Sequence, residues 1–245
     1  MGVIAAMAND GDGGAIPGDH MKAGFGVPPE ARTLVLEAPL RLECGDELAR
    51  CTLAYTCYGE LNAAGDNAAI VGHSLTSNSN VHEWWAEMIG EGERYALDTT
   101  KLFVVCVNYL GSPYGSTSPV TPMPAGAGDA DGDDKAAVTE QARYGADFPA
   151  PVTMRDNVAA QYALLRELGV TRLRCVLGGS MGSMLALEWA ACHPDFVGSV
   201  VMIAGCGRHT GTSAHAGAWA RAYARGLSGC AGACDRAAGF TGANV

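Results

Sequence analysis

The segment at residues 178–182, Gly-Gly-Ser-Met-Gly, constrains the fold of this chain more than any other. It follows an apolar run, residues 173–177, and precedes a helix-like run, residues 183–190. A serine between small residues, at a tight turn from strand to helix, is the arrangement of a nucleophile elbow. Gly178 and Gly182 supply the space and backbone freedom that such a turn needs. At the amino end of a helix, backbone N–H groups and the helix dipole favour an oxyanion.

The same five-residue pattern also arises by chance in glycine-rich chains, and this chain has 33 glycines. The strand and helix patterns on either side favour an elbow over coincidence. Apolar residues make up 48% of the chain and charged residues 17%, which is typical of a globular protein with a sizeable core. No apolar run is long enough for a membrane-spanning helix, and no signal peptide is recognisable, so we expect no membrane partner.

The net charge and the cysteine content indicate which partners, cellular location and metal to expect. The net charge of −10 argues against nucleic acid and anionic membranes as partners. Nine scattered cysteines without a disulfide framework predict reduced thiols and a cytoplasmic location. Cys230 and Cys234 are spaced like half of a metal site, but no second pair accompanies them, so we expect no metal.

Short apolar runs predict the strands of one sheet. A turn at 44–46 suggests that the first two strands form a hairpin. Continuous apolar strands that alternate with helical segments indicate an α/β fold with a mostly parallel sheet and helices on both faces. The expected strands are residues 33–36, 50–55, 68–71, 103–107, 173–177 and 199–203.

Two helices are expected beside the elbow. Thr153 and Asp156 resemble a capping box at the start of the first helix, and Gly169 is a typical stop. The second helix follows the elbow and is expected to end at His193-Pro194. The apolar stripe of the first helix, which we interpret as core, is Val158, Tyr162, Leu165 and Leu168.

The chain divides into three parts, the second of which contains an insertion. Residues 1–30 are expected to be a disordered tail, and residues 31–220 an α/β domain, which the family resemblance described below implies is partial. Residues 125–143 form an acidic insertion, which we interpret as a solvated loop because it lacks the final Glu of a calcium loop. Residues 221–245 are a divergent tail rich in Gly and Ala.

Nine segments, taken in order, closely resemble the homoserine O-acetyltransferase family of the α/β-hydrolase superfamily over about residues 31–218. The form Gly-Ser-Pro-Tyr-Gly at 111–115 is similar to the fungal and related eukaryotic branch, which includes serine O-acyltransferases. The resemblance implies an α/β-hydrolase fold, here without its C-terminal strands and helical lid. The segments are 58–62, 73–76, 83–85, 89–92, 97–99, 108–115, 144–149, 153–158 and 178–182.

The resemblance also implies a reaction, a step in methionine biosynthesis. Ser180 would be the nucleophile that takes an acetyl group from acetyl-CoA and passes it to homoserine, or to serine. The oxyanion hole would be formed by the backbone N–H groups of Leu75 and Met181. Acetyl-CoA would be a co-substrate, no further cofactor is expected, and a homodimer is possible.

The chain departs from the family in three places. Ser183 stands where the family usually has glycine, and Arg221, Tyr223 and Ala224 replace a Glu and a Gln-Arg pair. The family's catalytic acid and histidine come well over a hundred residues after the serine, whereas 65 residues follow Ser180 here. We identify no triad Asp or His, because none of the remaining candidates lies in the family's motifs. These candidates are Asp195, Asp235, His193, His209 and His215.

Three other functions remain open. The chain could be a serine O-acyltransferase, or a catalytically inactive, truncated homologue that acts as a binding subunit. It could also be an esterase that uses the same serine with water as the acceptor. Without a base, Ser180 stays a neutral alcohol, so we expect low activity from the chain as written.

Overall fold

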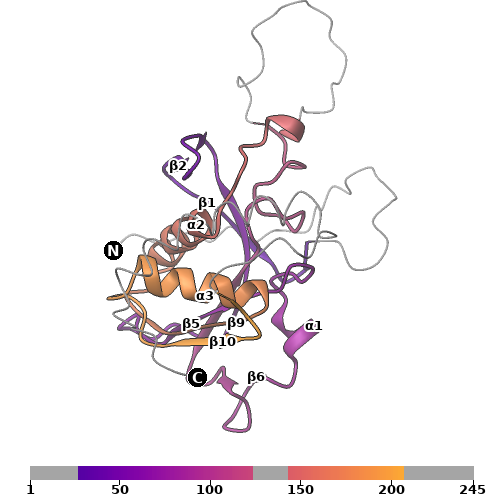
Figure 1. The fold of residues 1–245 in the computed structure, drawn as a ribbon. Coiled ribbons are helices and arrows are strands. Elements are labelled where there is room, and N and C mark those ends of the chain that lie inside the picture. Colours follow the sequence, from indigo (N-terminus) through magenta and orange to yellow (C-terminus); the bar gives the residue numbers. More distant parts are fainter. Residues whose placement is uncertain (1–26, 124–142, 207–245) are drawn as a thin grey trace, which may run out of the picture.

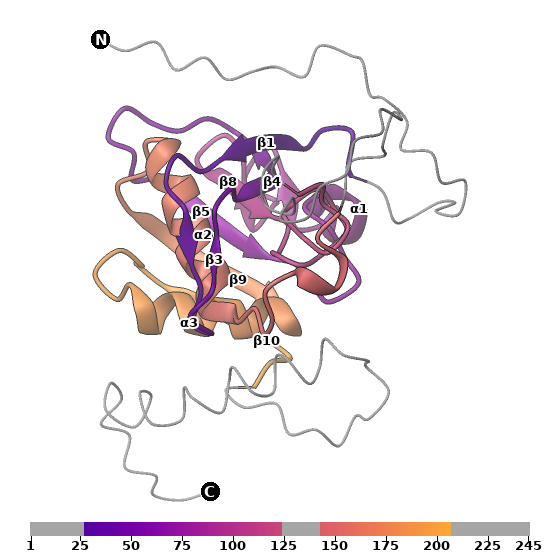
Figure 2. The ribbon, with the colours of Figure 1, turned by 90° about the horizontal axis from the view of Figure 1, so that it is seen from above.

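In the computed structural model of the chain, residues 27–123 and 143–206 are described. They form a central six-stranded sheet in the order β1-β4-β8-β5-β9-β10 (Figures 1 and 2). The strands are β1 (Arg32–Val35), β4 (Thr52–Tyr58), β5 (Ala68–Gly72), β8 (Phe103–Val107), β9 (Leu173–Gly179) and β10 (Val200–Ile203).

The sheet is antiparallel at one side and parallel over the rest. β4 pairs antiparallel with both β1 and β8, whereas β8, β5, β9 and β10 run parallel to one another. The six predicted strands are confirmed, with the ends of 103–107 unchanged and the other ends within three residues of the prediction. The predicted hairpin also exists, but a smaller ribbon of β2 (Leu40–Arg41) and β3 (Glu47–Leu48) lies within its connection.

Two helices cover one face of the parallel strands, α2 (Met154–Glu167) and α3 (Met181–Cys192) (Figure 1). The predicted capping box is confirmed, because the Thr153 side chain accepts the Asp156 N–H and the Asp156 side chain accepts the Thr153 N–H. Trp189 of α3 is fully buried in the core on this face. The predicted stop is also confirmed, since Gly169 follows α2 with a φ of 86°.

The opposite face carries a second hydrophobic cluster. It is covered by the short helix α1 (Val81–Trp85) and by the paired strands β6 (Ile89–Gly90) and β7 (Leu97–Asp98). One 3₁₀ turn, Gly145–Asp147, completes the described elements. Helical segments therefore lie on both faces of the sheet, as predicted.

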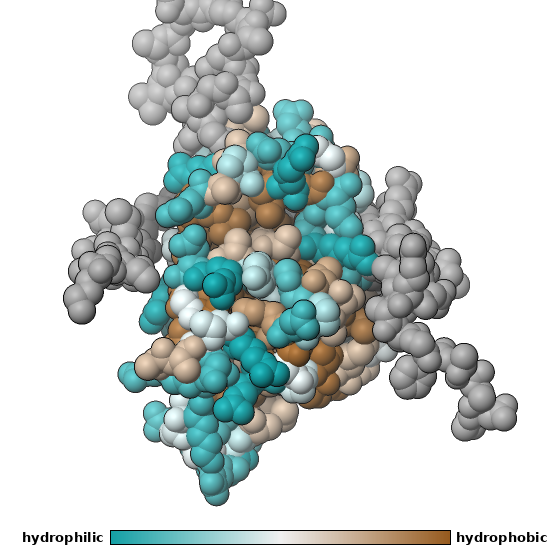
Figure 3. Space-filling model, turned by 90° about the vertical axis from the view of Figure 1, so that its left-hand side faces the viewer, coloured by the Kyte–Doolittle hydropathy of each residue, from teal (hydrophilic) through white to brown (hydrophobic). Residues whose placement is uncertain are grey.

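The surface combines hydrophilic and hydrophobic regions. Figure 3 shows hydrophilic residues over the lower tip of the molecule and hydrophobic patches nearer its middle. The described residues include no helix that is both long and apolar enough to cross a membrane. Most of the predicted acidic insertion at 125–143, the 221–245 tail and residues 1–26 lie outside the described ranges.

Candidate active site

Ser180 lies at the single-residue turn between β9 and α3. Its φ and ψ are 55° and −117°, and Ala204 is the other non-glycine residue with positive φ in the described ranges. Such a backbone conformation costs a serine about 1–3 kcal/mol. A strained serine between a parallel strand and a helix is the geometry of a nucleophile elbow.

The glycines around Ser180 allow the helix to approach the sheet. A side chain at Gly178 would overlap the carbonyl of Gly182, and one at Gly182 would overlap the carbonyl of Gly72 at the end of β5. The first turn of α3 thus packs directly on the backbone of two neighbouring strands. This close approach supplies a steric reason for the glycines that the sequence singled out.

The predicted oxyanion donors lie on adjacent strand ends. Gly72 is paired with Gly178, so the loop that follows β5 and the elbow that follows β9 leave the same edge of the sheet. Leu75 belongs to that loop, and Met181 is the first residue of α3. Neither backbone N–H donates a hydrogen bond to another described residue, so both are available to a ligand.

Two side chains flank the elbow. The Ser74 hydroxyl donates to the carbonyl of Gly179 over 3.3 Å. On the α1 side, the Trp85 ring would lie 3.5 Å from a Cβ at Gly179, so the second glycine of the motif has room for a methyl group. Trp85 and Ser74 therefore both lie beside Gly179, the residue before Ser180.

Ser183 is fully buried beneath the elbow. Its hydroxyl donates to the Ser180 carbonyl over 2.6 Å, and its N–H donates to the same carbonyl over 3.1 Å. A side chain at Gly205 would overlap the Ser183 hydroxyl. The serine at this position is thus accommodated because residue 205 is glycine.

Three residues that sequence reasoning did not single out hold the loop after β5. They are His73, Tyr109 and Tyr114, and the hydroxyls of both tyrosines donate to carbonyls of the loop. Burial lowers the pKa of His73 to about 4, so its imidazole is neutral at physiological pH. All three lie within segments 73–76 and 108–115, whose spacing carried the family resemblance but no individual role.

The candidate acid and base residues are not brought to Ser180 in the described part of the chain. The Ser180 hydroxyl makes no hydrogen bond there to a histidine or a carboxylate. His193 caps the opposite end of α3 and stacks on Tyr162 with ring centroids 4.2 Å apart. Asp195 lies in the turn after it, and His209, His215 and Asp235 are outside the described residues.

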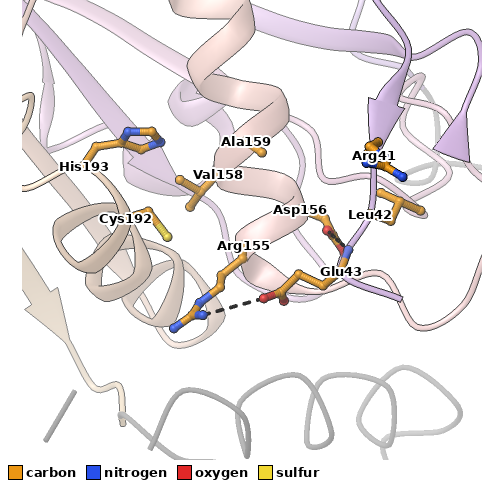
Figure 4. Close-up of a pocket in the computed structure, with 9 residues that line it drawn as sticks. All are labelled: Arg41, Leu42, Glu43, Arg155, Asp156, Val158, Ala159, Cys192 and His193. Carbon is orange, nitrogen blue, oxygen red and sulfur yellow. Dashed lines mark hydrogen bonds and ion pairs between the residues drawn. The ribbon is translucent and has the colours of Figure 1, made fainter. Parts of the chain in front are cut away.

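A pocket of about 350 Å³ lies near the carboxyl end of α3 (Figure 4). Arg155 at its rim pairs with Glu188 at 3.0 Å and with Glu43 at 3.7 Å. A helix of twelve residues is about 18 Å long, so this pocket and Ser180 lie at opposite ends of α3. Its lining is Arg41, Leu42, Glu43, Arg155, Asp156, Val158, Ala159, Cys192 and His193.

Three of the described thiols are made unreactive by burial. Burial raises the pKa of Cys51 and of Cys57 to about 12 and also raises that of Cys106, which keeps these groups protonated. The seven described cysteines are free thiols, and no group of metal-binding side chains is found among the described residues. Cys230 and Cys234 lie outside those ranges.

Comparison with known proteins identifies the family to which the chain belongs. The family profile described as alpha/beta hydrolase fold matches residues 67–244, so the chain belongs to that family. Within it, the chain is 44% identical over 181 residues to the homoserine O-acetyltransferase of Moorella thermoacetica, covering 70% of this chain and 44% of that protein. It is 46% identical over 175 residues to that of Salinibacter ruber, covering 70% and 45%.

Solved structures show the same relationship. The homoserine O-acetyltransferase of Bacillus anthracis matches with a TM-score of 0.61 at 25% identity, over 74% of this chain and 48% of that one. An acetylester hydrolase from Corynebacterium glutamicum matches with a TM-score of 0.59 at 31% identity, over 74% and 45%. The chain spans less than half the length of these relatives. The similarity to homoserine O-acetyltransferases inferred from the motifs is thereby confirmed.

Proposed function

We propose that the chain carries the acyl-accepting half of a homoserine O-acetyltransferase, with Ser180 as the nucleophile. The observation that carries the proposal is the strained backbone of Ser180, held between β9 and α3 by the contacts of Gly178 and Gly182. Relatives named homoserine O-acetyltransferase at 44% and 46% identity support this choice of reaction.

The reaction would proceed in two steps. The Ser180 hydroxyl oxygen attacks the thioester carbonyl of acetyl-CoA, its proton passes to a base, and the coenzyme A thiolate leaves. The homoserine hydroxyl then attacks the acetyl-serine ester, and Ser180 recovers a proton as O-acetylhomoserine departs. The N–H groups of Leu75 and Met181 would stabilise the oxyanion in both steps, each by roughly 3–4 kcal/mol.

A base is needed for the first step, and the described residues place none on Ser180. Removal of a triad histidine can slow catalysis by about a million-fold, although oxyanion stabilisation remains. We therefore expect slow acetylation of Ser180 by this chain. Serine as acceptor, and membership of the fungal-like branch, remain predictions.

Acetyl ester hydrolysis is the second candidate. It is favoured by the solved acetylester hydrolase from Corynebacterium glutamicum, which shares the fold at 31% identity. Both reactions pass through an acetyl-serine, and they differ in whether water or an amino-acid hydroxyl attacks it. Ser180 would form the acetyl-serine intermediate in either reaction.

The remaining parts of the proposal concern surroundings and partners. Acetyl-CoA is a co-substrate, and no other cofactor is invoked. The net charge of −10 favours small-molecule substrates over nucleic acid or membrane, and the scattered cysteines favour the cytoplasm. A role as a binding subunit or homodimer partner remains an alternative for a chain that spans under half of its relatives.

Intact mass spectrometry after incubation with acetyl-CoA tests the proposal. We expect a mass increase of about 42 Da, one acetyl group, on the protein and none on the Ser180→Ala variant. Ser199→Ala, which removes an exposed serine hydroxyl, is the matched control and should still be labelled. Folded protein that stays unlabelled over hours would contradict the proposal. Faster loss of the label with homoserine than with buffer alone would favour transfer over hydrolysis.

A further inference from the structure

The loop after β5, residues 73–77, is fixed from two sides. The Tyr109 hydroxyl donates to the His73 carbonyl over 2.9 Å, and the Tyr114 hydroxyl donates to the Thr76 carbonyl over 3.2 Å. Both tyrosines come from the segment after β8, the strand that neighbours β5. Two carbonyls of the loop are therefore tied to the sheet, on either side of Leu75.

The carbonyl between them is held by His73 itself. Its Nδ1 lies 2.8 Å from the Ser74 carbonyl oxygen. A carbonyl oxygen can only accept, so Nδ1 must carry the proton and the ring must be the neutral Nδ1–H tautomer. The ring is fully buried and packs on Tyr109 at 4.1 Å between centroids.

The other ring nitrogen, Nε2, gives no reason for a histidine at this position. Nε2 is buried and has no hydrogen-bond partner among the described residues. A buried acceptor without a donor costs folding free energy. An apolar side chain would avoid this cost, so the bond made by Nδ1 is the reason that we can give for a histidine at this position.

The Ser74 carbonyl and the Leu75 N–H belong to one peptide unit. The structure has its only described cis peptide at Ala150-Pro151, so this unit is trans. In a planar trans peptide the C=O and the N–H point in opposite directions. A bond that fixes the direction of the Ser74 carbonyl therefore also fixes the direction of the Leu75 N–H.

We propose that His73 is a positioning residue, whose Nδ1–H holds the Ser74 carbonyl and thereby directs the Leu75 N–H towards the oxyanion formed at Ser180. The inference rests on the proposed function, because it assigns the Leu75 N–H to the oxyanion. The Ser74 hydroxyl, which bonds the Gly179 carbonyl, couples the same peptide to the elbow.

Two isosteric variants test the proposal. In His73→Asn the side-chain amide can donate from the place of Nδ1, whereas in His73→Gln the amide lies at the place of Nε2. Exchange of the Ser77 amide hydrogen, which donates to the same Ser74 carbonyl over 3.1 Å, reports on the loop by NMR. We expect exchange within about threefold of the parent for Asn, and about tenfold faster exchange for Gln.

The chemical readout uses p-nitrophenyl acetate as the acetyl donor for Ser180. The maximal acetylation rate should fall by about tenfold to a hundredfold in His73→Gln, with the KM for the ester unchanged, because a misdirected donor weakens only the oxyanion. His73→Asn should restore most of that rate. Tyr109→Phe keeps the ring but removes the hydroxyl, and it provides a second variant of the same loop if His73→Gln does not fold.

Nitrogen-15 shifts of the His73 ring give an independent measurement. The Nδ1–H tautomer is expected in the parent, and an Nε2–H tautomer would overturn the proposal, as would equal Ser77 exchange in the Asn and Gln variants. If Ser180 accepts no acetyl group in the parent, the proposed function fails, while the tautomer and exchange results still decide whether His73 directs the Leu75 peptide.

Discussion

Residues 178, 179 and 182 are all glycine, yet they meet very different surroundings. A Cβ at residue 182 would overlap the Gly72 carbonyl, which is backbone of a central strand, whereas one at residue 179 would lie 3.5 Å from the Trp85 ring. The backbone of a central strand cannot easily move away from an added methyl group. A Cβ at 3.5 Å from the Trp85 ring is at ordinary van der Waals distance, so nothing has to move. Glycine is therefore required for steric reasons at residue 182 but not at residue 179.

We expect Gly182→Ala to destabilise the fold by about 1–3 kcal/mol or more, because the helix must move away from the sheet. Gly179→Ala is its matched control and should change the free energy of unfolding by less than about 1 kcal/mol. Urea denaturation followed by tryptophan fluorescence measures both. Equal losses in the two variants would show that the contact with Gly72 does not limit the position of α3.

His73 makes the stability of the protein depend on pH. Its folded-state pKa is lowered from 6.5 to about 4 by burial. Protonation then favours the unfolded chain, so the contribution of the neutral ring is full above about pH 6.5 and is lost as the pH falls towards 4. The maximal loss is about 3 kcal/mol.

The prediction is measured as the difference between parent and His73→Asn in urea denaturation at about pH 7.5 and pH 4.5, since the carboxylates titrate equally in both. The parent should lose more stability on acidification than the variant. Parallel losses would show that the ring is protonated without penalty.

At the scale of elements, the start of α2 joins two parts of the chain that are far apart in sequence. The Thr153 hydroxyl accepts from the Asp156 N–H and donates to the Glu43 carboxylate over 2.5 Å, and Asp156 accepts the Glu43 N–H over 2.8 Å. The capping box therefore also holds the connection between β2 and β3. Thr153 and Asp156 each contribute both to the helix end and to a tertiary contact.

Thr153→Ala should lower the free energy of unfolding by about 0.5–2 kcal/mol, the usual value of an N-cap. Glu167→Ala, at the exposed end of the same helix, should stay within about 0.5 kcal/mol of the parent. Thermal unfolding followed by circular dichroism compares them. A similar loss in both variants would mean that the capping box contributes nothing beyond helix propensity.

Local patterns predicted the long elements well. The capping box at Thr153 and the apolar runs of β5 and β8 each depend on neighbours in sequence, so the sequence alone predicted them. The two-residue strands β6 and β7 were not predicted, since so short a pairing leaves no periodic pattern. Their position depends on tertiary packing, since Ile89 and Leu97 are buried in the second hydrophobic cluster against the central sheet.

The candidate site was predictable in part for the same reason. Ser180 and its glycines form a contiguous motif, whereas the bond of His73 to the Ser74 carbonyl depends on burial by Tyr109, 36 residues further along. The fit of Ser183 against Gly205 likewise joins residues that no local pattern connects. Spacing could mark these segments as important but could not assign a bond to any side chain.

At the scale of the whole molecule, the described sheet ends in an apolar edge. β10 pairs only with β9 among the described strands, and its Val201, Met202 and Ile203 are 46%, 40% and 40% exposed. Strand edges with exposed apolar side chains tend to associate. We expect the protein to form larger species as its concentration rises.

Val201→Lys should reduce this association, because a charge on an edge strand opposes edge-to-edge pairing. Val120→Lys is the control, since Val120 has a similar exposure, 44%, but lies in a loop. Light scattering over a concentration series measures the effect. An equal reduction by both variants would point to net charge instead of the edge.

The contact between Gly182 and the end of β5 has a consequence for heating. Ser180 follows β9 and Leu75 follows β5, so two neighbouring strands inside the sheet support one small site. Segments of low stability open separately from the rest of a protein, but strands at the centre of a sheet open only with it. The capacity of Ser180 to be acetylated should therefore vanish over the same few degrees as the fold itself, without an earlier inactivation step.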